Sequence, residues 1–266
     1  MHKIYVTLAT VMFICLGCNW NMKPADEASE GLVQVERYDR LQSLYLTTGD
    51  FSALQQMNTG YPQQTRTLIE DVLKIGRVNE PEINVKFLNF YQDTTLQSLI
   101  ASSEQAFANM DDINEELSEA FSRLQNMIPG IKIPQIYAQI GSLDQSIIVG
   151  DGTLGISLDK YLGRDFPLYH RADYGYTDEQ RDMMNRHNIV PDCIGFYLLS
   201  LHPMPHDRQT SQLERDMYIG KVQWVVNQAM DRQVFNTLYT RNVGHFMKTH
   251  SDVTIEQLLT STRVRP

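Results

Sequence analysis

The 266-residue chain is acidic, with 32 aspartates and glutamates, 23 lysines and arginines, and a formal net charge of −9. An acidic chain without a basic cluster argues against nucleic-acid binding, because the phosphate backbone is held by clustered cations. The length is sufficient for one large domain or two small ones.

Residues 1–17 have the pattern of an export signal. Lys3 supplies a positive start, and residues 4–16 form an apolar run that is too short to cross a bilayer as a helix. The run ends in Gly17 and Cys18, and a small residue before a cysteine is typical of bacterial lipoprotein signals, although Cys15 stands where leucine is more usual. We expect cleavage before Cys18 and lipid attachment to its thiol. The alternatives are a secretory signal cut elsewhere and an uncleaved anchor.

The residues after Cys18 bear on the final location. Asn19 and Trp20 follow it, with neither an inner-membrane-retention aspartate nor an acidic run for surface export. We therefore expect a lipid-anchored protein of the outer membrane that faces the periplasm. Acyl chains would hold it there without a basic patch.

Cysteine usage limits the covalent chemistry. Cys15 leaves with the signal and Cys18 carries lipid, so Cys193 is the one thiol left in the mature chain. No internal disulfide can form. Cys193 lies in an apolar run, which favours a buried inert thiol over a nucleophile, because reactive cysteines need an accessible, electropositive setting.

The first half of the mature chain is predicted to be helical. Residues 18–34 are polar and are expected to form a lipidated tether. Apolar stripes with helical spacing follow over residues 35–46, 51–57 (after Asp50 as N-cap), 62–73 (opened by Pro62 and ended by Gly76), 94–108 and 113–127. The last of these is the most regular.

The hydrophobic period then changes to alternation. Apolar residues alternate with others over residues 136–140 and 154–158, and the turn-forming pair Asp151 and Gly152 stands between strand-like runs. We predict an antiparallel meander over residues 133–158, with Leu154, Ile156 and Leu158 facing the core.

Helical patterns return in the last part of the chain. Thr177 with Gln180 and Ser211 with Glu214 have the capping-box form, the first opening a helix to about residue 187. Further helices are predicted over residues 191–201, 235–247 and 253–259. Helices, a small meander and helices again indicate an α+β fold, with one domain over residues 35–266.

Three motifs resemble known chemical signatures. Residues 150–155 match G-x-G-x-x-G, but a nucleotide fingerprint needs a following helix and a strand pattern follows here, so a hairpin turn is preferred. His202 and His206 have metal-ligand spacing, but Pro203 and Pro205 forbid the helix that would align them. Ser157 lies in a G-x-S-x-D sequence that resembles a nucleophile elbow only weakly.

The central part of the chain resembles the GldB-type gliding-motility lipoproteins. The resemblance runs from about residue 35 to residue 230, and a shorter stretch, residues 247–255, is similar to the family's C-terminal end. The segments that carry it are ERYD at 36–39, IEDVL at 69–73, KIPQIY at 132–137, LGISLDKYLG at 154–163, FPLY at 166–169, IVPD at 189–192 and GK at 220–221. The lipoprotein signal belongs to the same pattern.

The resemblance implies a zincin-like architecture without its metal. Zincin peptidases carry H-E-x-x-H on their active helix and a glutamate on a later helix. Residues 191–201 would take the place of that helix. Residues 193–196, which include Cys193 and Phe196, stand where ligands would be needed, and residues 218–220, beginning with Tyr218, stand where the later Glu-Gly would lie. We therefore expect no cofactor and no metal, and a region filled by Phe196, Tyr197 and Trp224. Candidate residues of a remnant cleft are Asp159, Asp192, Cys193, Phe196 and Tyr218.

Three functional hypotheses follow from these observations. The first is a non-catalytic envelope lipoprotein that acts as a binding or scaffolding module, since the family's role is in gliding and the associated type IX secretion. The alternative is a metal-independent hydrolase that uses the same cleft. A third is a partner-dependent structural subunit with a large exposed apolar patch. The expected contacts are the membrane through the lipid and an envelope protein partner, with no nucleic acid.

Overall fold

The computed structural model describes residues 32–204 and 211–260. All of them lie in one compact unit. Cys18 and the signal lie outside the described residues. The folded part begins before Val35, because Val33 is buried and its backbone N–H donates to Ser118 Oγ at 2.8 Å.

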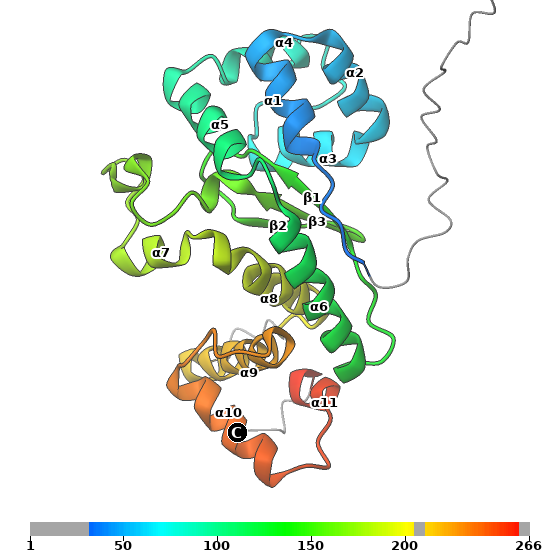
Figure 1. Cartoon of the computed structure of the whole chain (residues 1–266), viewed down its shortest axis with the longest axis vertical. Coiled ribbons are helices and arrows are strands. Elements are labelled where there is room, and N and C mark those ends of the chain that lie inside the picture. The colour runs from blue at the N-terminus through cyan, green and yellow to red at the C-terminus, as the bar shows by residue number, and fades with distance from the viewer. Residues whose placement is uncertain (1–31, 205–210, 261–266) are drawn as a thin grey trace, which may run out of the picture. The chain divides into compact units, whose positions relative to one another are not determined.

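Helices cover most of the first half of the chain (Figure 1). They are α1 (Tyr38–Thr48), α2 (Phe51–Gly60), α3 (Pro62–Arg66) continued by a π-helical turn (Thr67–Val72), α4 (Ile83–Phe90), α5 (Thr94–Ala106) and α6 (Asp111–Met127). The Asp50 carboxylate caps α2 by accepting the N–H groups of Ser52 and Ala53, as predicted. Helix α4 was not predicted from the sequence; it has no side-chain cap and buries only Ile83 and Phe87.

Three short strands follow: β1 (Gln135–Gln139), β2 (Ile147–Val149) and β3 (Thr153–Ser157). The hairpin around Asp151 and Gly152 is confirmed, since β2 and β3 pair antiparallel and no helix starts at Gly152. Leu154, Ile156 and Leu158 are all fully buried, as predicted.

The antiparallel meander is wrong in one respect. The strand order is β1-β3-β2, and β1 pairs parallel with β3, with Gln135 opposite Thr153 and Gln139 opposite Ser157. The chain leaves β1 and crosses to the far edge of the sheet before the hairpin brings β3 back between the other two. The sheet is therefore mixed, and β3 is buried along its whole length because it is the central strand.

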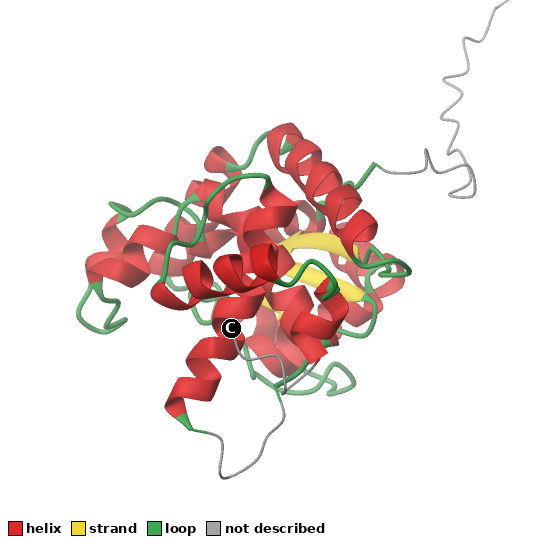
Figure 2. Ribbon diagram, turned by 90° about the horizontal axis from the view of Figure 1, so that it is seen from below, coloured by secondary structure: helices red, strands yellow, loops and turns green. Residues whose placement is uncertain are grey.

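The sheet separates two hydrophobic cores. Ile136, Leu154 and Ile156 point toward a core formed with α6, α8 and α9, whereas Tyr137 and Ile148 point toward a core formed with α1 to α4. Figure 2 shows the strands enclosed by helices. The N-terminal segment extends the sheet by one bridge, since Glu36 exchanges backbone hydrogen bonds with Ile136 and Ala138 at 2.8 Å each.

After β3 the chain forms a segment of short elements over residues 158–188, called the excursion below, and then four helices. The elements are η2 (Leu158–Lys160), η3 (Pro167–His170), α7 (Asp178–Met183), η4 (Arg186–Asn188), α8 (Ile189–Leu201), α9 (Gln212–Met230), α10 (Leu238–Thr249) and α11 (Ile255–Thr260). Both capping boxes are present, at Thr177 and at Ser211. The helix from Thr177 ends at Met183 instead of residue 187, because the chain turns there into η4.

Candidate functional site

Asp159 lies at the point where β3 gives way to the excursion, and it is fully buried. Its carboxylate accepts the backbone N–H groups of Gly141 at 2.6 Å and Leu143 at 2.8 Å. Burial raises the pKa of Asp159, and these two hydrogen bonds oppose the rise. The carboxylate thus holds the loop that carries the chain from β1 toward β2, including Leu143 in a left-handed conformation with φ of 64°.

Two buried tyrosines and a lysine complete the polar cluster around Asp159. The Tyr169 hydroxyl donates to the Asp159 carbonyl at 2.6 Å, and the Tyr91 hydroxyl contacts the Gly141 carbonyl at 2.9 Å. The Lys160 ammonium donates to the Leu143 carbonyl at 3.2 Å and lies 4.3 Å from the centre of the Tyr176 ring. Burial lowers the pKa of Lys160. These groups fix the excursion to the loop after β1.

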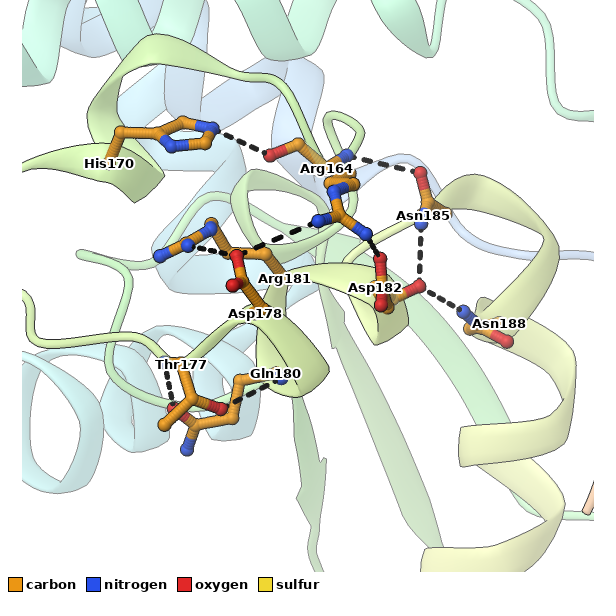
Figure 3. Close-up of polar contacts among 9 residues, drawn as sticks. All are labelled: Arg164, His170, Thr177, Asp178, Gln180, Arg181, Asp182, Asn185 and Asn188. Carbon is orange, nitrogen blue, oxygen red and sulfur yellow. Dashed lines mark hydrogen bonds and ion pairs between the residues drawn. The ribbon is translucent and has the colours of Figure 1, made fainter.

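The outer part of the excursion is held by a charged network (Figure 3). The Arg164 guanidinium pairs with Asp182 and lies 3.6 Å from Asp178, which also pairs with Arg181. The backbone N–H of Arg164 donates to Asn185 Oδ1 at 3.1 Å. Each arginine of this network is paired with an aspartate. The network therefore supports the loop and does not offer an unpaired charge to a ligand.

Asp192 and Cys193 lie in the first turns of α8. The Tyr161 hydroxyl donates to Asp192 Oδ2 at 2.7 Å. Burial raises the pKa of Asp192 to about 6, and the hydrogen bond from Tyr161 opposes that rise. Cys193 is fully buried in the core, and burial raises the pKa of its thiol well above the ordinary value. Cys193 is therefore an inert thiol in the folded protein.

The five candidate cleft residues do not meet in one place. Asp159 accepts hydrogen bonds from the loop after β1, whereas Asp192 and Cys193 are adjacent on α8, and Asp192 contacts Tyr161. Tyr218 comes from α9, and its buried hydroxyl finds no hydrogen-bond partner among the described residues. The expectation that Phe196 fills the region is wrong: its side chain is 41% exposed, because α8 turns that face away from the core.

The other two residues expected to fill the region are placed differently. Tyr197 is buried, and its hydroxyl donates to the Lys132 carbonyl at 2.6 Å. Trp224 is half-buried and packs against the same core from α9. Within residues 32–204 and 211–260, no group of three His, Cys, Asp or Glu side chains converges as metal ligands would. His202 ends α8, and His206 lies outside the described residues.

The structure has a groove that sequence reasoning did not predict. It is open, measures about 700 Å³, and runs between the C-terminal half of α9, the turn after it, and α10. Its lining comprises Trp224, Asn227, Gln228, Asp231, Arg232, Gln233, Thr240, Arg241, Gly244, His245, Met247, Lys248, Ser251 and Val253. The volume is within the range of binding sites for small ligands.

Two glycines allow α9 and α10 to form this groove. A Cβ on Gly220 would lie 2.5 Å from Tyr239 Cβ, so glycine there permits the two helices to approach closely. A Cβ on Gly244 would lie 3.2 Å from Trp224 Nε1, so the indole rests across the backbone of α10. The available signal in the sequence was Arg241, His245 and Lys248, whose spacing places them on one face of a helix.

Comparison with known families places the chain. The model of the family described as gliding motility protein GldB matches residues 19–239, which is most of the chain. The match extends the resemblance over residues 35–230 in both directions, and residues 247–255 lie outside it. Comparisons with curated proteins and with solved structures gave no match. In the part of the chain that the structure describes, no helix is long and apolar enough to cross a membrane. On the extent of the family match, the chain belongs to the GldB family of gliding-motility proteins.

Proposed function

We propose that the chain is a non-catalytic, lipid-anchored envelope protein that acts as a binding or scaffolding module in the gliding-motility machinery. The match to the GldB family over residues 19–239 is the observation that carries this proposal. We further infer that α8 occupies the place of the zinc helix in zincin peptidases. The apolar and thiol residues on α8 support the loss of catalysis, because zinc catalysis needs three protein ligands and an open position for water.

The polar groups of the fold also support a non-catalytic role. The Asp159 carboxylate is occupied by two backbone N–H groups, the Lys160 ammonium by a carbonyl and a hydroxyl, and the Arg164 guanidinium by carboxylates. A catalytic acid, base or nucleophile has to reach a substrate, and each of these groups is engaged in holding a loop.

Genetic complementation tests the proposal directly. In a host that glides, deletion of the gene should abolish colony spreading, and plasmid-borne Asp192→Asn and Cys193→Ala variants should restore it as well as the wild type does. Failure of either variant to restore spreading, at normal protein level, would argue for catalysis. Stoichiometric zinc in the purified protein would also overturn the non-catalytic assignment.

One observation favours a second candidate, a metal-independent hydrolase. A carboxyl group with a pKa of about 6 beside a tyrosine hydroxyl, as at Asp192 and Tyr161, has the properties of a general acid or base. Hydrolysis of fluorogenic peptide or ester substrates by the purified protein, lost in Asp192→Asn and kept in Asp165→Asn, would favour the hydrolase.

The location forms part of the same proposal: attachment through lipid on Cys18 to the outer membrane, facing the periplasm. Cys18→Ser should release the protein from the membrane fraction or block its processing, whereas Cys193→Ser should leave it in the outer-membrane fraction. Undiminished membrane attachment of a correctly cleaved Cys18→Ser variant would contradict the lipid anchor. Protease protection in intact cells, lost on opening the outer membrane, tests the periplasmic orientation.

A further inference from the structure

The groove between α9 and α10 differs in charge from the chain as a whole. Its lining includes Arg232, Arg241 and Lys248 against a single carboxylate, Asp231, whereas the whole chain has a net charge of −9. All four charged side chains are exposed. A local excess of cations in an acidic protein attracts an anionic ligand over the background repulsion.

Two of these cations are available to a ligand. Arg232 pairs with Glu116 at 2.8 Å, so its charge is already balanced. The Arg241 guanidinium donates to the backbone carbonyl and the side-chain oxygen of Asn236, both at 3.1 Å, and these partners are uncharged. Lys248 has no side-chain partner among the described residues. Among the described residues, neither Arg241 nor Lys248 has a carboxylate partner, and together they exceed the one carboxylate of the lining, Asp231, by one positive charge.

The rest of the lining suits a peptide. The Trp224 indole, Met247 and Val253 supply apolar surface, and the indole N–H donates to no acceptor within the described residues. Gln228 and Gln233 add amide groups that can pair with a peptide backbone. Asn227 instead builds the wall, since its side chain holds the turn through Val234, Phe235 and their backbone groups at 2.8–2.9 Å.

We propose that this groove binds an acidic peptide segment of a partner protein, with carboxylates paired to Arg241 and Lys248 and an apolar side chain packed on Trp224. The inference rests on the proposed binding role and gives that role a location and a ligand class. A concave groove whose lining includes apolar side chains favours a peptide over an anionic membrane, which would contact cations on a protruding face. Lipid attachment and family membership do not depend on whether this groove binds a ligand.

Trp224 provides the readout, because the chain has two tryptophans and Trp20→Phe leaves Trp224 as the sole indole. Titration of this full-length protein in detergent with a short synthetic peptide that alternates glutamate and leucine should change the Trp224 emission and saturate. The same peptide with glutamine in place of glutamate should bind at least about tenfold more weakly, and added salt should weaken the acidic peptide's binding.

Charge reversal tests the residues. Arg241→Glu with Lys248→Glu should weaken binding of the acidic peptide by about tenfold or more. The matched control is Lys74→Glu with Lys132→Glu, which makes the same charge change at two exposed lysines outside the groove lining. The control should bind the peptide within about twofold of the parent, because long-range repulsion is screened at physiological salt.

Three outcomes overturn the proposal. An equal loss of peptide affinity in both double variants would mean that the effect arises from the net charge of the protein and not from the groove. Absence of saturable binding of the acidic peptide would show that acidic peptides are not the ligand. Binding to vesicles that contain phosphatidylglycerol, lost in the groove variant while the peptide does not bind, would assign the groove to a membrane. None of these outcomes affects the Cys18 and complementation tests, so failure here is distinguishable from failure of the proposed function.

Discussion

The carboxylate of Asp159 accepts the backbone N–H of Gly141 at 2.6 Å in a fully buried setting, and this contact links the end of β3 to the loop that leaves β1. A Cβ on Gly141 would lie 3.3 Å from Ser157 Oγ and 3.4 Å from Asp159 Oδ1, so the backbone is pressed against the carboxylate. The path of the chain from β1 to the far edge of the sheet depends on this loop.

Asp159→Ala should destabilise the protein. The substitution leaves the N–H groups of Gly141 and Leu143 buried without acceptors, and each such loss costs about 1–3 kcal/mol, so we expect a decrease of roughly 3 kcal/mol in the free energy of unfolding. Urea denaturation followed by circular dichroism measures it. Asp165→Ala, at an exposed aspartate of the same excursion, should change stability by less than about 0.5 kcal/mol. Equal stability of the two variants would mean that the carboxylate does not support the loop.

Asp192 should make stability depend on pH. Its pKa rises from 3.8 to about 6 on folding, so the folded protein holds the proton more tightly than the unfolded chain does. The stabilisation is fully present below pH 3.8 and is lost as the pH rises toward 6. By linkage the difference amounts to roughly 3 kcal/mol.

Comparison with Asp192→Asn isolates this effect from other carboxyl groups. The amide oxygen can still accept the Tyr161 hydroxyl, but it does not titrate. The unfolding free energy of Asp192→Asn minus that of the wild type should therefore increase between pH 4 and pH 6 and then level off, measured by urea titrations across that range. A flat difference would show that the pKa of Asp192 is close to its unfolded value.

Local signals in the sequence predicted the helix starts well. Asp50, Thr177 with Gln180, and Ser211 with Glu214 each cap a helix as expected, because a cap involves residues two or three positions apart. The hairpin at Asp151 and Gly152 is local in the same sense. In contrast, α4 was missed because it is only eight residues long, lacks a capping side chain and buries only Ile83 and Phe87, so its apolar stripe is short.

The partner of β1 could not be predicted from its alternation. An alternating pattern identifies a strand but not its neighbour, and here the choice depends on contacts distant in sequence. Beyond the end of β1, Ile140 is held by the Gln42 side chain, which accepts its N–H at 2.8 Å and donates to its carbonyl at 2.6 Å. That contact spans 98 residues and directs the chain away from an antiparallel return.

Residue spacing also limited how much of the candidate site could be predicted from the sequence. The spacing of Arg241, His245 and Lys248 places them on one helix face, but whether that face is open depends on how α9 packs against α10 through Gly220 and Gly244. Likewise, Phe196 was assigned to the interior from its apolar character, while the orientation of α8 leaves it exposed.

The close packing of β1 on β3 makes Gly155 sensitive to substitution. A Cβ at Gly155 would lie 2.6 Å from Cζ of Tyr137, a buried ring that cannot retreat because it packs edge-on against Tyr38. Gly155→Ala should lower the free energy of unfolding by about 1–3 kcal/mol through overpacking. The control is Gly60→Ala, where nothing lies within 4 Å of the added Cβ, and it should be neutral or stabilising in thermal unfolding. Similar melting temperatures for both variants would contradict the tight contact.

The charged network around Arg164 should matter locally and not globally. Arg164 and its partners Asp178 and Asp182 are exposed, and exposed ion pairs contribute less than about 1 kcal/mol, so Arg164→Ala should leave the urea midpoint almost unchanged. The excursion, however, loses the contacts that hold α7, and trypsin should cut faster after Arg171 and Arg181. Mass spectrometry of the first fragments identifies the sites.

Arg66→Ala, at an exposed arginine on α3, should leave both the cleavage rate and the sites as in the wild type. Unchanged cleavage in Arg164→Ala would show that Asp159, Lys160 and Tyr169 hold the excursion without the network.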